Sequence, residues 1–225
     1  MKRINQISSW LVTISSPFVI IMLAVRILFT PLFLIIEYNF PGFPPDSYGF
    51  TTEDRLRWGT DSMNYLFDRT NTKSFSDLKF EDGSNIYNDR EISHMIDVKV
   101  LLQKMLNIFY VILGIYILIF IASIKNKNYQ YFYKGLSRGG WVTIGLLTVI
   151  IAGIVISFDQ LFTLFHKLFF TGDTWLFNYS DTLIRLFPMR LWQDAFIMMG
   201  VISLIISFVC VSLGKKQRKN EIVGK

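Results

Sequence analysis

The sequence predicts an all-α membrane protein with four transmembrane helices, an extracytoplasmic loop domain and an interfacial helix after the third span. Hydrophobic residues make up 52% of the 225 residues, and they gather in four blocks. The blocks cover residues 10–36, 105–124, 141–158 and 195–213, and each provides close to the roughly 20 apolar residues that a spanning helix needs. Four such blocks in one chain indicate a multi-pass protein, which we treat as one membrane domain over residues 1–225.

The polar stretch 39–98 is expected to hold the loop domain. Thr51 and Asp54 have the spacing of a helix capping box, so a short helix is expected to begin there. Asp82-Gly83 lies between two short apolar runs, which favours a small β-hairpin. A second capping box over residues 88–91 opens a helix that is expected to run without a break into the second span.

The second polar stretch, residues 159–194, begins with an amphipathic segment. Its apolar residues recur at helical spacing, which predicts an interfacial helix or a continuation of the third span; they are Leu161, Leu164, Phe165, Leu168 and Phe169. A short helix is expected over residues 180–187, ending at Pro188.

Basic residues are concentrated beside the spans, at the N-terminus, in the second connection and in the C-terminal tail. The stretch 39–98 instead has eleven acidic and six basic residues. By the positive-inside rule, both termini are expected in the cytoplasm, and 39–98 and 159–194 outside it. The net charge of +6 then reflects the topology of a cell-membrane protein, and no nucleic-acid partner is expected.

The two histidines, His94 and His166, both fall in the stretches expected outside the cytoplasm. Asp97 and Glu91 are three residues from His94 on a predicted helix, so a carboxylate could orient the imidazole for acid–base catalysis. The same spacing would occur on a solvated helix face. His166 lies among phenylalanines, where burial favours the neutral imidazole, although it could also serve only to anchor an interfacial helix.

Arg26 is the one charged residue within the four apolar blocks. A charge at that depth is costly, so it is expected either to reach the interface or to pair with Glu37, a lipid phosphate or a developing oxyanion, with Asp194 as the best alternative partner. Pro17 and Pro31 are expected to kink this first helix. The sequence contains no phosphate-loop or HExxH motif, and no metal site is expected.

Several segments together resemble the lipoprotein intramolecular transacylase family of Gram-positive bacteria. They are EISHMIDVKVLL from Glu91, Glu37-Tyr38 at the end of the first span, YGFTTEDR from Tyr48, and FHKLFFTGDTWLFNYSDTLIRLFP from Phe165. The resemblance covers nearly the whole chain and implies a cofactor-independent acyltransferase with His94 and His166 as its catalytic residues.

The resemblance also implies a diacylated lipoprotein substrate, whose N-terminal cysteine carries a thioether-linked diacylglycerol and a free α-amine. The enzyme would move the sn-2 acyl chain to that amine and leave an N-acyl, S-monoacylglyceryl (lyso) lipoprotein. Amide formation from an ester is downhill, so no cofactor is expected. The partners would be this lipoprotein and membrane lipid, and we expect a monomer.

Our hypothesis from the sequence is that His94, oriented by Asp97 or Glu91, removes the amine proton and that His166 protonates the glyceryl oxygen. Arg26 or Tyr48 would stabilise the oxyanion. Glu37 would contribute to substrate binding, and an aromatic stripe would bound the acyl chain; it consists of Phe165, Phe169, Trp175 and Phe177. Transfer through an acyl-enzyme is the alternative mechanism.

Two other functions fit the same pattern. A lipase or lipid phosphatase could use the same histidines and would release fatty acid or phosphate. A non-enzymatic scaffold or transporter subunit would tolerate their replacement. The sequence shows no inverted repeat or pair of broken helices, which would favour a transporter.

Overall fold

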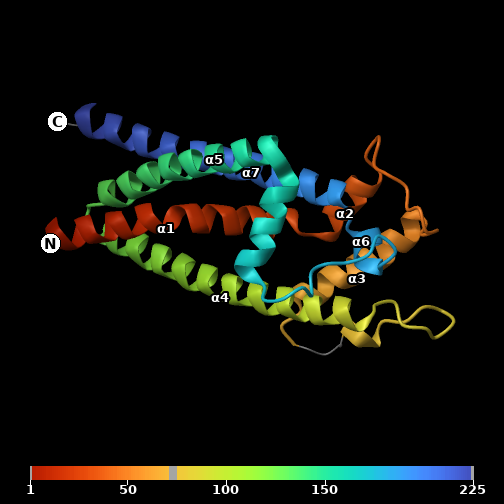
Figure 1. Cartoon of the computed structure of the whole chain (residues 1–225). Helices are drawn as coiled ribbons and strands as arrows, with labels where there is room; N and C mark the ends of the chain where they lie inside the picture. The colour runs from red at the N-terminus through yellow and green to blue at the C-terminus, as the bar shows by residue number, and fades with distance from the viewer. Residues whose placement is uncertain (1, 71–74, 224–225) are drawn as a thin grey trace. The chain divides into compact units, whose positions relative to one another are not determined.

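The computed structural model describes residues 2–70 and 75–223 (Figure 1). The helices in the described part are α1 (Lys2–Leu28), α2 (Pro31–Tyr38), α3 (Thr52–Phe67), the 3-10 turn η1 (Phe75–Asp77), α4 (Asp89–Lys125), α5 (Gln130–Phe169), α6 (Thr182–Leu186) and α7 (Met189–Val223). They form two compact units. Unit 1 comprises Met1–Arg26, Leu106–Ile156 and Ile197–Lys225, and unit 2 comprises Ile27–Met105 and Ser157–Phe196.

Four helices in the described part are long and apolar enough to cross a membrane: α1, α4, α5 and residues Met189–Arg218 of α7. This confirms the predicted fold class. The first block differs from a single kinked helix, because α1 ends at Leu28 and α2 starts at Pro31. Proline lacks an N–H and fits the first turn of a helix, so Pro31 begins a new helix here. Pro17 lies inside α1 as expected.

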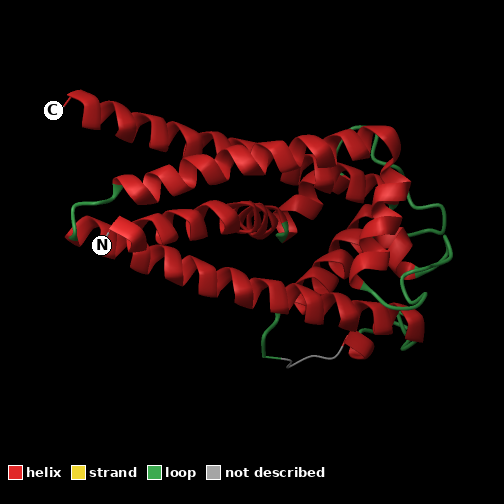
Figure 2. Ribbon diagram, turned by 60° about the vertical axis from the view of Figure 1, so that its left-hand side comes forward, coloured by secondary structure: helices red, strands yellow, loops and turns green. Residues whose placement is uncertain are grey.

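Close backbone approach holds the helices of unit 1 together. A Cβ built on Gly139 of α5 would lie 2.3 Å from Ser16 of α1, and one on Gly140 would lie 2.7 Å from the main-chain oxygen of Ser207 in α7. Tyr116 of α4 donates a hydrogen bond of 2.9 Å to the main-chain oxygen of Val12. Small residues and interhelical hydrogen bonds are the usual means of association between spanning helices. In Figure 2, the loop between α4 and α5 lies at the same end of unit 1 as both ends of the chain.

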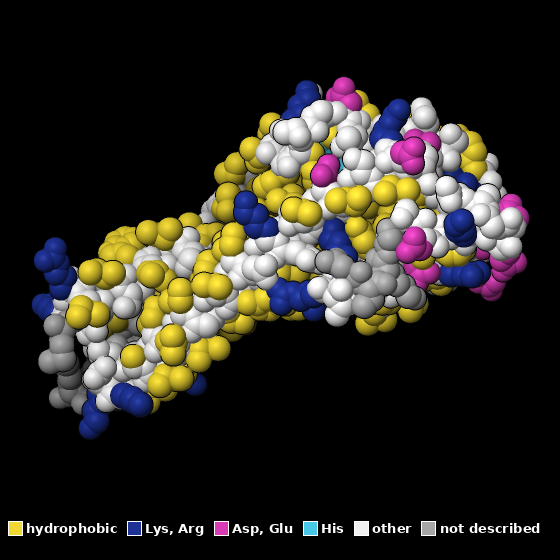
Figure 3. Space-filling view, turned by 90° about the horizontal axis from the view of Figure 1, so that it is seen from below, with side chains coloured by type: hydrophobic (Ala, Val, Ile, Leu, Met, Phe, Trp, Pro, Cys, Tyr) yellow, Lys and Arg dark blue, Asp and Glu magenta, His cyan; other side chains and the backbone are white. Residues whose placement is uncertain are grey.

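The surface of unit 1 is apolar along its helices. Side chains such as Val149, Val155 and Leu118 are 70%, 80% and 68% exposed, which suits contact with lipid. Lys and Arg lie both at the end of unit 1 that carries the chain termini and over unit 2, whereas the acidic side chains in view lie over unit 2 (Figure 3).

Unit 2 contains the predicted loop domain. The Thr51–Asp54 capping box forms as expected, since the Asp54 amide donates to Thr51 Oγ1 and the Thr51 amide donates to Asp54 Oδ2. The hairpin is reduced to a single antiparallel bridge between Lys79 and Asn85, with Gly83 at a φ of +83° in its turn. A buried cluster holds α3, α4 and α6 together; it consists of Trp58, Phe75, Ile86, Tyr87, Met95, Leu183 and Leu186.

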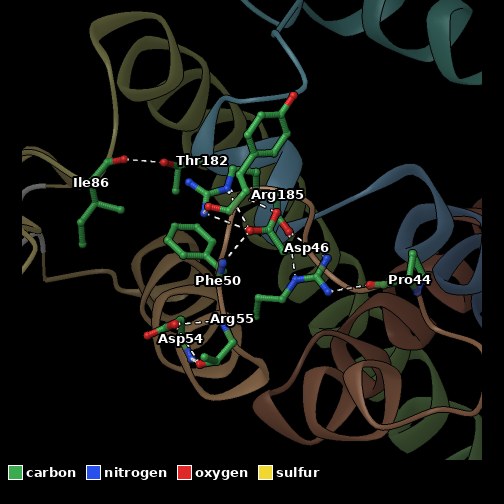
Figure 4. A network of polar contacts seen from close by, with 10 residues as sticks. Pro44, Asp46, Phe50, Asp54, Arg55, Ile86, Thr182 and Arg185 are labelled. Carbon is green, nitrogen blue, oxygen red and sulfur yellow. Dashed lines mark hydrogen bonds and ion pairs between the residues drawn. The ribbon is translucent and has the colours of Figure 1, made fainter.

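A polar network fixes the loop before α3 to α6 (Figure 4). Arg185 of α6 forms a 3.0 Å ion pair with Asp46, and Asp46 also accepts the Phe50 amide at 2.7 Å. Burial alone would raise the pKa of Asp46, but its hydrogen bond to Arg185 and the positive charge there hold that pKa below its usual value. Arg55 of α3 completes the network by donating to the main-chain oxygens of Arg185 and Pro44.

Candidate functional site

The structure brings the two histidines together within unit 2. His94 lies in the second turn of α4, and His166 lies near the end of α5. Their ring centroids are 5.9 Å apart with 27° between the ring planes, and each residue is only 8% exposed. The α5 segment that carries His166 begins after Ser157, whose φ of −163° and ψ of 102° interrupt the helix. This interruption separates the α5 segment of unit 2 from that of unit 1.

Aromatic rings enclose the two imidazoles, and we call the following residues the aromatic enclosure: Phe162, Phe165, Phe170, Trp175 and Phe177. Phe170 contacts both histidines, with centroid distances of 5.1 Å to His94 and 5.6 Å to His166. Phe162 and Trp175 lie 4.2 Å and 5.0 Å from His166. Phe177 lies 5.4 Å from His94. Such surroundings limit water and favour the neutral imidazole over the imidazolium ion.

The hydrogen bonds of the two rings differ. Nδ1 of His166 lies 2.8 Å from the main-chain oxygen of Phe162. A carbonyl oxygen can only accept, so Nδ1 carries the proton and the neutral ring presents its lone pair at Nε2. Nδ1 of His94 is buried and has no hydrogen-bond partner in the described part of the chain. A buried polar atom without a partner is unusual.

The two carboxylates expected to orient His94 lie elsewhere. Glu91 is 1% exposed, and its carboxylate accepts hydrogen bonds from the main-chain amides of Asn88 at 2.8 Å and Leu183 at 2.6 Å. It therefore caps α4, as the sequence predicted, and also binds the first turn of α6. Asp97 is exposed. No hydrogen bond joins either carboxylate to His94 among the described residues.

The predicted oxyanion residues, Tyr48 and Arg26, belong to other segments of the chain than the aromatic enclosure. Tyr48 is 54% exposed, and its ring lies 5.7 Å from the Arg185 guanidinium. Arg26 is half-buried and is the last residue of the first segment of unit 1. Their roles at the oxyanion remain predictions.

Glu37 and the predicted acyl-binding residues occupy different places in unit 2. Glu37 is 3% exposed, on the face of α2 that also carries Phe33 and Leu34. Trp175 and Phe165 belong to the aromatic enclosure, and Phe165 contacts Phe169 at 4.9 Å. Phe165 and Phe169 are 38% and 40% exposed, so this pair lies where the enclosure meets the surface.

Sequence reasoning missed Phe162 and placed Phe170 only among the phenylalanines around His166. Phe162 supplies the oxygen that holds His166, and Phe170 is the one ring of the enclosure that contacts both histidines. Their spacing of four residues on either side of His166 places them next to it along a helix, so this signal was present in the sequence. The side chain of His94 could not be added to this group from spacing, because it lies on another helix.

Comparison with known proteins supports the fold throughout the chain. The structure matches in meso structures of the membrane integral lipoprotein intramolecular transacylase Lit from Bacillus cereus. One matches with a TM-score of 0.79 and 25% identity, over 97% of this chain and all of the other. A second, with one histidine replaced by arginine, matches with a TM-score of 0.77 and 23% identity, over 100% of this chain and 96% of the other.

Sequence comparison agrees. An uncharacterized protein of Aquifex aeolicus is 27% identical over 223 residues, which covers 96% of this chain and 99% of that protein. The family described as "Lipoprotein intramolecular transacylase Lit" matches residues 10–192, a range that includes both histidines and the whole aromatic enclosure. The chain therefore belongs to the lipoprotein intramolecular transacylase family and is a four-span membrane acyltransferase.

Proposed function

We propose that the protein transfers the sn-2 acyl chain of a diacylglyceryl-cysteine lipoprotein to the α-amine of the same cysteine. The nitrogen attacks the ester carbonyl, a C–N bond forms, and the C–O bond to the glycerol breaks. One proton moves from the nitrogen to the glyceryl oxygen, so the reaction is balanced without any other reactant. The observation that carries the proposal is the pair of imidazoles 5.9 Å apart inside one aromatic enclosure.

The hydrogen bonds suggest a role for each histidine. With Nδ1 donating to Phe162, His166 can accept the amine proton at Nε2 and serve as the general base. His94 then donates a hydrogen bond to the carbonyl or glyceryl oxygen as negative charge develops there. This reverses the order of roles expected from the sequence, and the fixed tautomer of His166 is the reason.

The aromatic enclosure would favour the reaction by orienting the substrate. Amine and ester are parts of one molecule, and orienting them in contact can supply several kcal/mol toward the barrier, about 7–11 kcal/mol at most. The exposed edge at Phe165 and Phe169 would admit the acyl chain from the lipid. We propose that a single chain suffices, because both histidines and the enclosure come from one copy.

The distribution of charge supports a site on the outer side of the cell membrane. The α4–α5 connection carries Lys125 and Lys127, and the α1 start carries Lys2 and Arg3. Both lie at the end of unit 1 that also carries the end of α7 (Figure 1). By the positive-inside rule this end faces the cytoplasm, and the substrate would be a lipoprotein anchored in the outer leaflet.

The test uses the purified full-length protein and a diacylated lipopeptide with a free N-terminal cysteine. The variants are His94→Ala and His166→Ala, and mass spectrometry distinguishes diacyl from lyso product. Each variant is expected to lose about 100-fold or more of the rate. Wild-type activity in either correctly inserted variant would contradict the proposal, and release of free fatty acid instead of amide would identify a hydrolase.

A further inference from the structure

Arg138 of α5 carries a charge that forms no ion pair with an acidic side chain among the described residues. Its guanidinium donates a hydrogen bond of 2.8 Å to Oγ of Ser9, and its Cζ lies 4.1 Å from the ring centre of Trp10. Its Nε is buried and has no hydrogen-bond partner in the part of the chain that the structure describes. Because a guanidinium carries five N–H donors, the protein satisfies only part of this group.

The packing of α5 on α1 fixes the position of Arg138. A Cβ built on Gly135, three residues earlier, would lie 2.7 Å from the main-chain oxygen of Ser9, so the two backbones are in direct contact here. Ser9 is 2% exposed, and the Thr13 hydroxyl donates to the main-chain oxygens of Ser9 and Gly135. Ser9 is therefore a fixed acceptor for Arg138, whereas the neighbouring Trp10 is 54% exposed at the surface of unit 1.

Arg138 belongs to one side of α5 that we call the basic-aromatic face; it consists of Lys134, Arg138 and Trp141. These residues are four and three apart, so they are neighbours on the helix surface. Lys134 is exposed. Trp141 is 53% exposed, and Nζ of Lys215 from α7 lies 5.8 Å from its ring centre. The glycines of α5 contact both α1 and α7, so Trp10 of α1 and Lys215 of α7 flank this face.

The level of the basic-aromatic face coincides with the ends of three apolar blocks. Trp10 begins the block 10–36, Arg138 precedes the block 141–158 by three residues, and Lys215 follows the block 195–213 by two. Three helices therefore place this face at the border of the hydrocarbon layer, where tryptophan is enriched and the lipid headgroups begin. The guanidinium of Arg138 is at the right depth to meet a lipid phosphate.

Unit 1 does not contain enough acidic residues to balance its own positive charge. Its segments hold twelve Lys or Arg residues and one acidic residue, Glu221. Basic residues beside a span attract anionic lipids, and the planar fork of a guanidinium matches the oxygens of a phosphate. The exposed rings of Trp10 and Trp141 suit the glycerol and acyl region next to a headgroup, which favours a phospholipid over free phosphate or an acidic peptide.

We propose that the basic-aromatic face, together with Trp10 and Lys215, binds the phosphodiester group of an anionic phospholipid from the leaflet at this end of unit 1. The remaining N–H groups of Arg138 donate to the phosphate oxygens, while Ser9 and Trp10 hold the guanidinium in place. Lys134 and Lys215 favour a headgroup with net negative charge over a zwitterionic one. This site uses no residue of the aromatic enclosure and does not depend on the proposed transacylase function.

The test measures lipid binding to the purified full-length protein in micelles of a neutral detergent. Native mass spectrometry follows titrations with phosphatidylglycerol and with phosphatidylcholine. The wild-type protein is expected to bind phosphatidylglycerol more tightly. Arg138→Gln should weaken that binding about fivefold or more, because one surface charge and its fork are lost, and should leave the binding of phosphatidylcholine unchanged. Equal wild-type affinities for the two lipids overturn the proposal.

Lys125→Gln is the matched control, because it removes the same charge from an exposed residue at the same end of unit 1. It should have little effect on the affinity for phosphatidylglycerol. A loss as large as that of Arg138→Gln would mean that the overall charge of unit 1 attracts anionic lipid without a defined site, and the proposal would be wrong.

Trp10→Leu keeps the test decisive if Arg138→Gln folds poorly, because it retains every charge and replaces an exposed ring. Loss of the stacking on Arg138 should weaken phosphatidylglycerol binding about two- to fivefold, and unchanged binding contradicts a site at Arg138. A large excess of sodium phosphate separates a lipid from a soluble anion as the source of the phosphate. It should leave phosphatidylglycerol bound, and displacement of the lipid would overturn the proposal.

Discussion

Oε1 of Glu91 accepts the main-chain amide of Leu183 at 2.6 Å, which joins the first turn of α4 to the first turn of α6. Both groups are buried. His94 follows Glu91 by three residues on the same face of α4. The carboxylate therefore determines where α4 begins and against which helix it packs, and so it places the imidazole without contacting it.

Replacing Glu91 by glutamine should separate a positioning role from a catalytic one. The glutamine oxygen can accept from Asn88 or Leu183 but not from both, and its NH₂ group would face the remaining amide. Leaving a buried donor unsatisfied costs about 1–3 kcal/mol, so we expect a lower unfolding midpoint and a lower rate. The pH dependence of the rate should keep its shape.

The matched control is Asp89→Asn, which alters an exposed carboxylate in the same turn of α4. It should have little effect on the unfolding midpoint. A changed pH profile in Glu91→Gln, with a normal midpoint, would instead make Glu91 the charge partner of His94.

The tautomer of His166 gives a second prediction. An asparagine amide can occupy the place of Nδ1–H and donate to the main-chain oxygen of Phe162, but it has no group at the position of Nε2. His166→Asn should therefore retain most of the wild-type stability and lose about 10²–10⁴ of the rate.

His166→Gln is the comparison, since its longer side chain reaches the place of Nε2 and leaves the Phe162 oxygen without its donor. We expect it to be less stable than His166→Asn and equally inactive. Thermal unfolding and the mass-spectrometric assay measure the two effects. Substantial activity in His166→Asn would show that Nε2 is not the base.

The packing of α5 against α1 gives a third prediction. A Cβ on Gly139 would lie 2.3 Å from the Ser16 side chain, so Gly139→Ala should force the two helices of unit 1 apart. Overpacking of this kind costs about 1–3 kcal/mol. A Cβ added to Gly145, on the same helix, would have no neighbouring atom within 4 Å, and Gly145→Ala should be neutral or slightly stabilising. Equal unfolding midpoints for the two variants would contradict the packing.

The parts of the fold that the sequence predicts are those that depend on residues close together in the chain. The apolar blocks predict the spanning helices, and pairs of side chains three residues apart predict the capping boxes at Thr51 and Asn88. Each of these features depends only on neighbours along the chain. The break at Pro31 was expected as a kink, since the sequence does not show whether other contacts preserve a helix through a proline.

The site was predictable only in part, for the same reason. His94 and His166 were identified as candidates by their rarity and by resemblance, but their contact joins residues far apart in the chain. Glu91 was assigned to His94 because spacing shows neighbours on one helix, whereas its second partner is Leu183, 92 residues away. Such long-range hydrogen bonds depend on how the helices of unit 2 pack.

The ion pair between Asp46 and Arg185 gives a fourth prediction, on pH and stability. The Asp46 side chain is 3% exposed and the Arg185 side chain 14%, so removing one partner leaves a largely buried charge. Asp46→Asn should cost about 3 kcal/mol of stability at neutral pH. The folded state also lowers the pKa of Asp46 from its ordinary value of 3.8, so the stabilisation is present above pH 3.8 and is lost as the pH falls through the lower, folded-state pKa.

Wild-type protein and Asp46→Asn should therefore become more alike in stability as the solution is acidified, which thermal unfolding at a series of pH values below 5 measures. The double variant Asp46→Asn/Arg185→Gln isolates the pair, because its loss should be smaller than the sum of the two single losses. If the losses in stability of the two single variants are additive, the two side chains contribute independently. The loop before α3 would then be held to α6 mainly by Arg55, through its hydrogen bonds to the main-chain oxygens of Pro44 and Arg185.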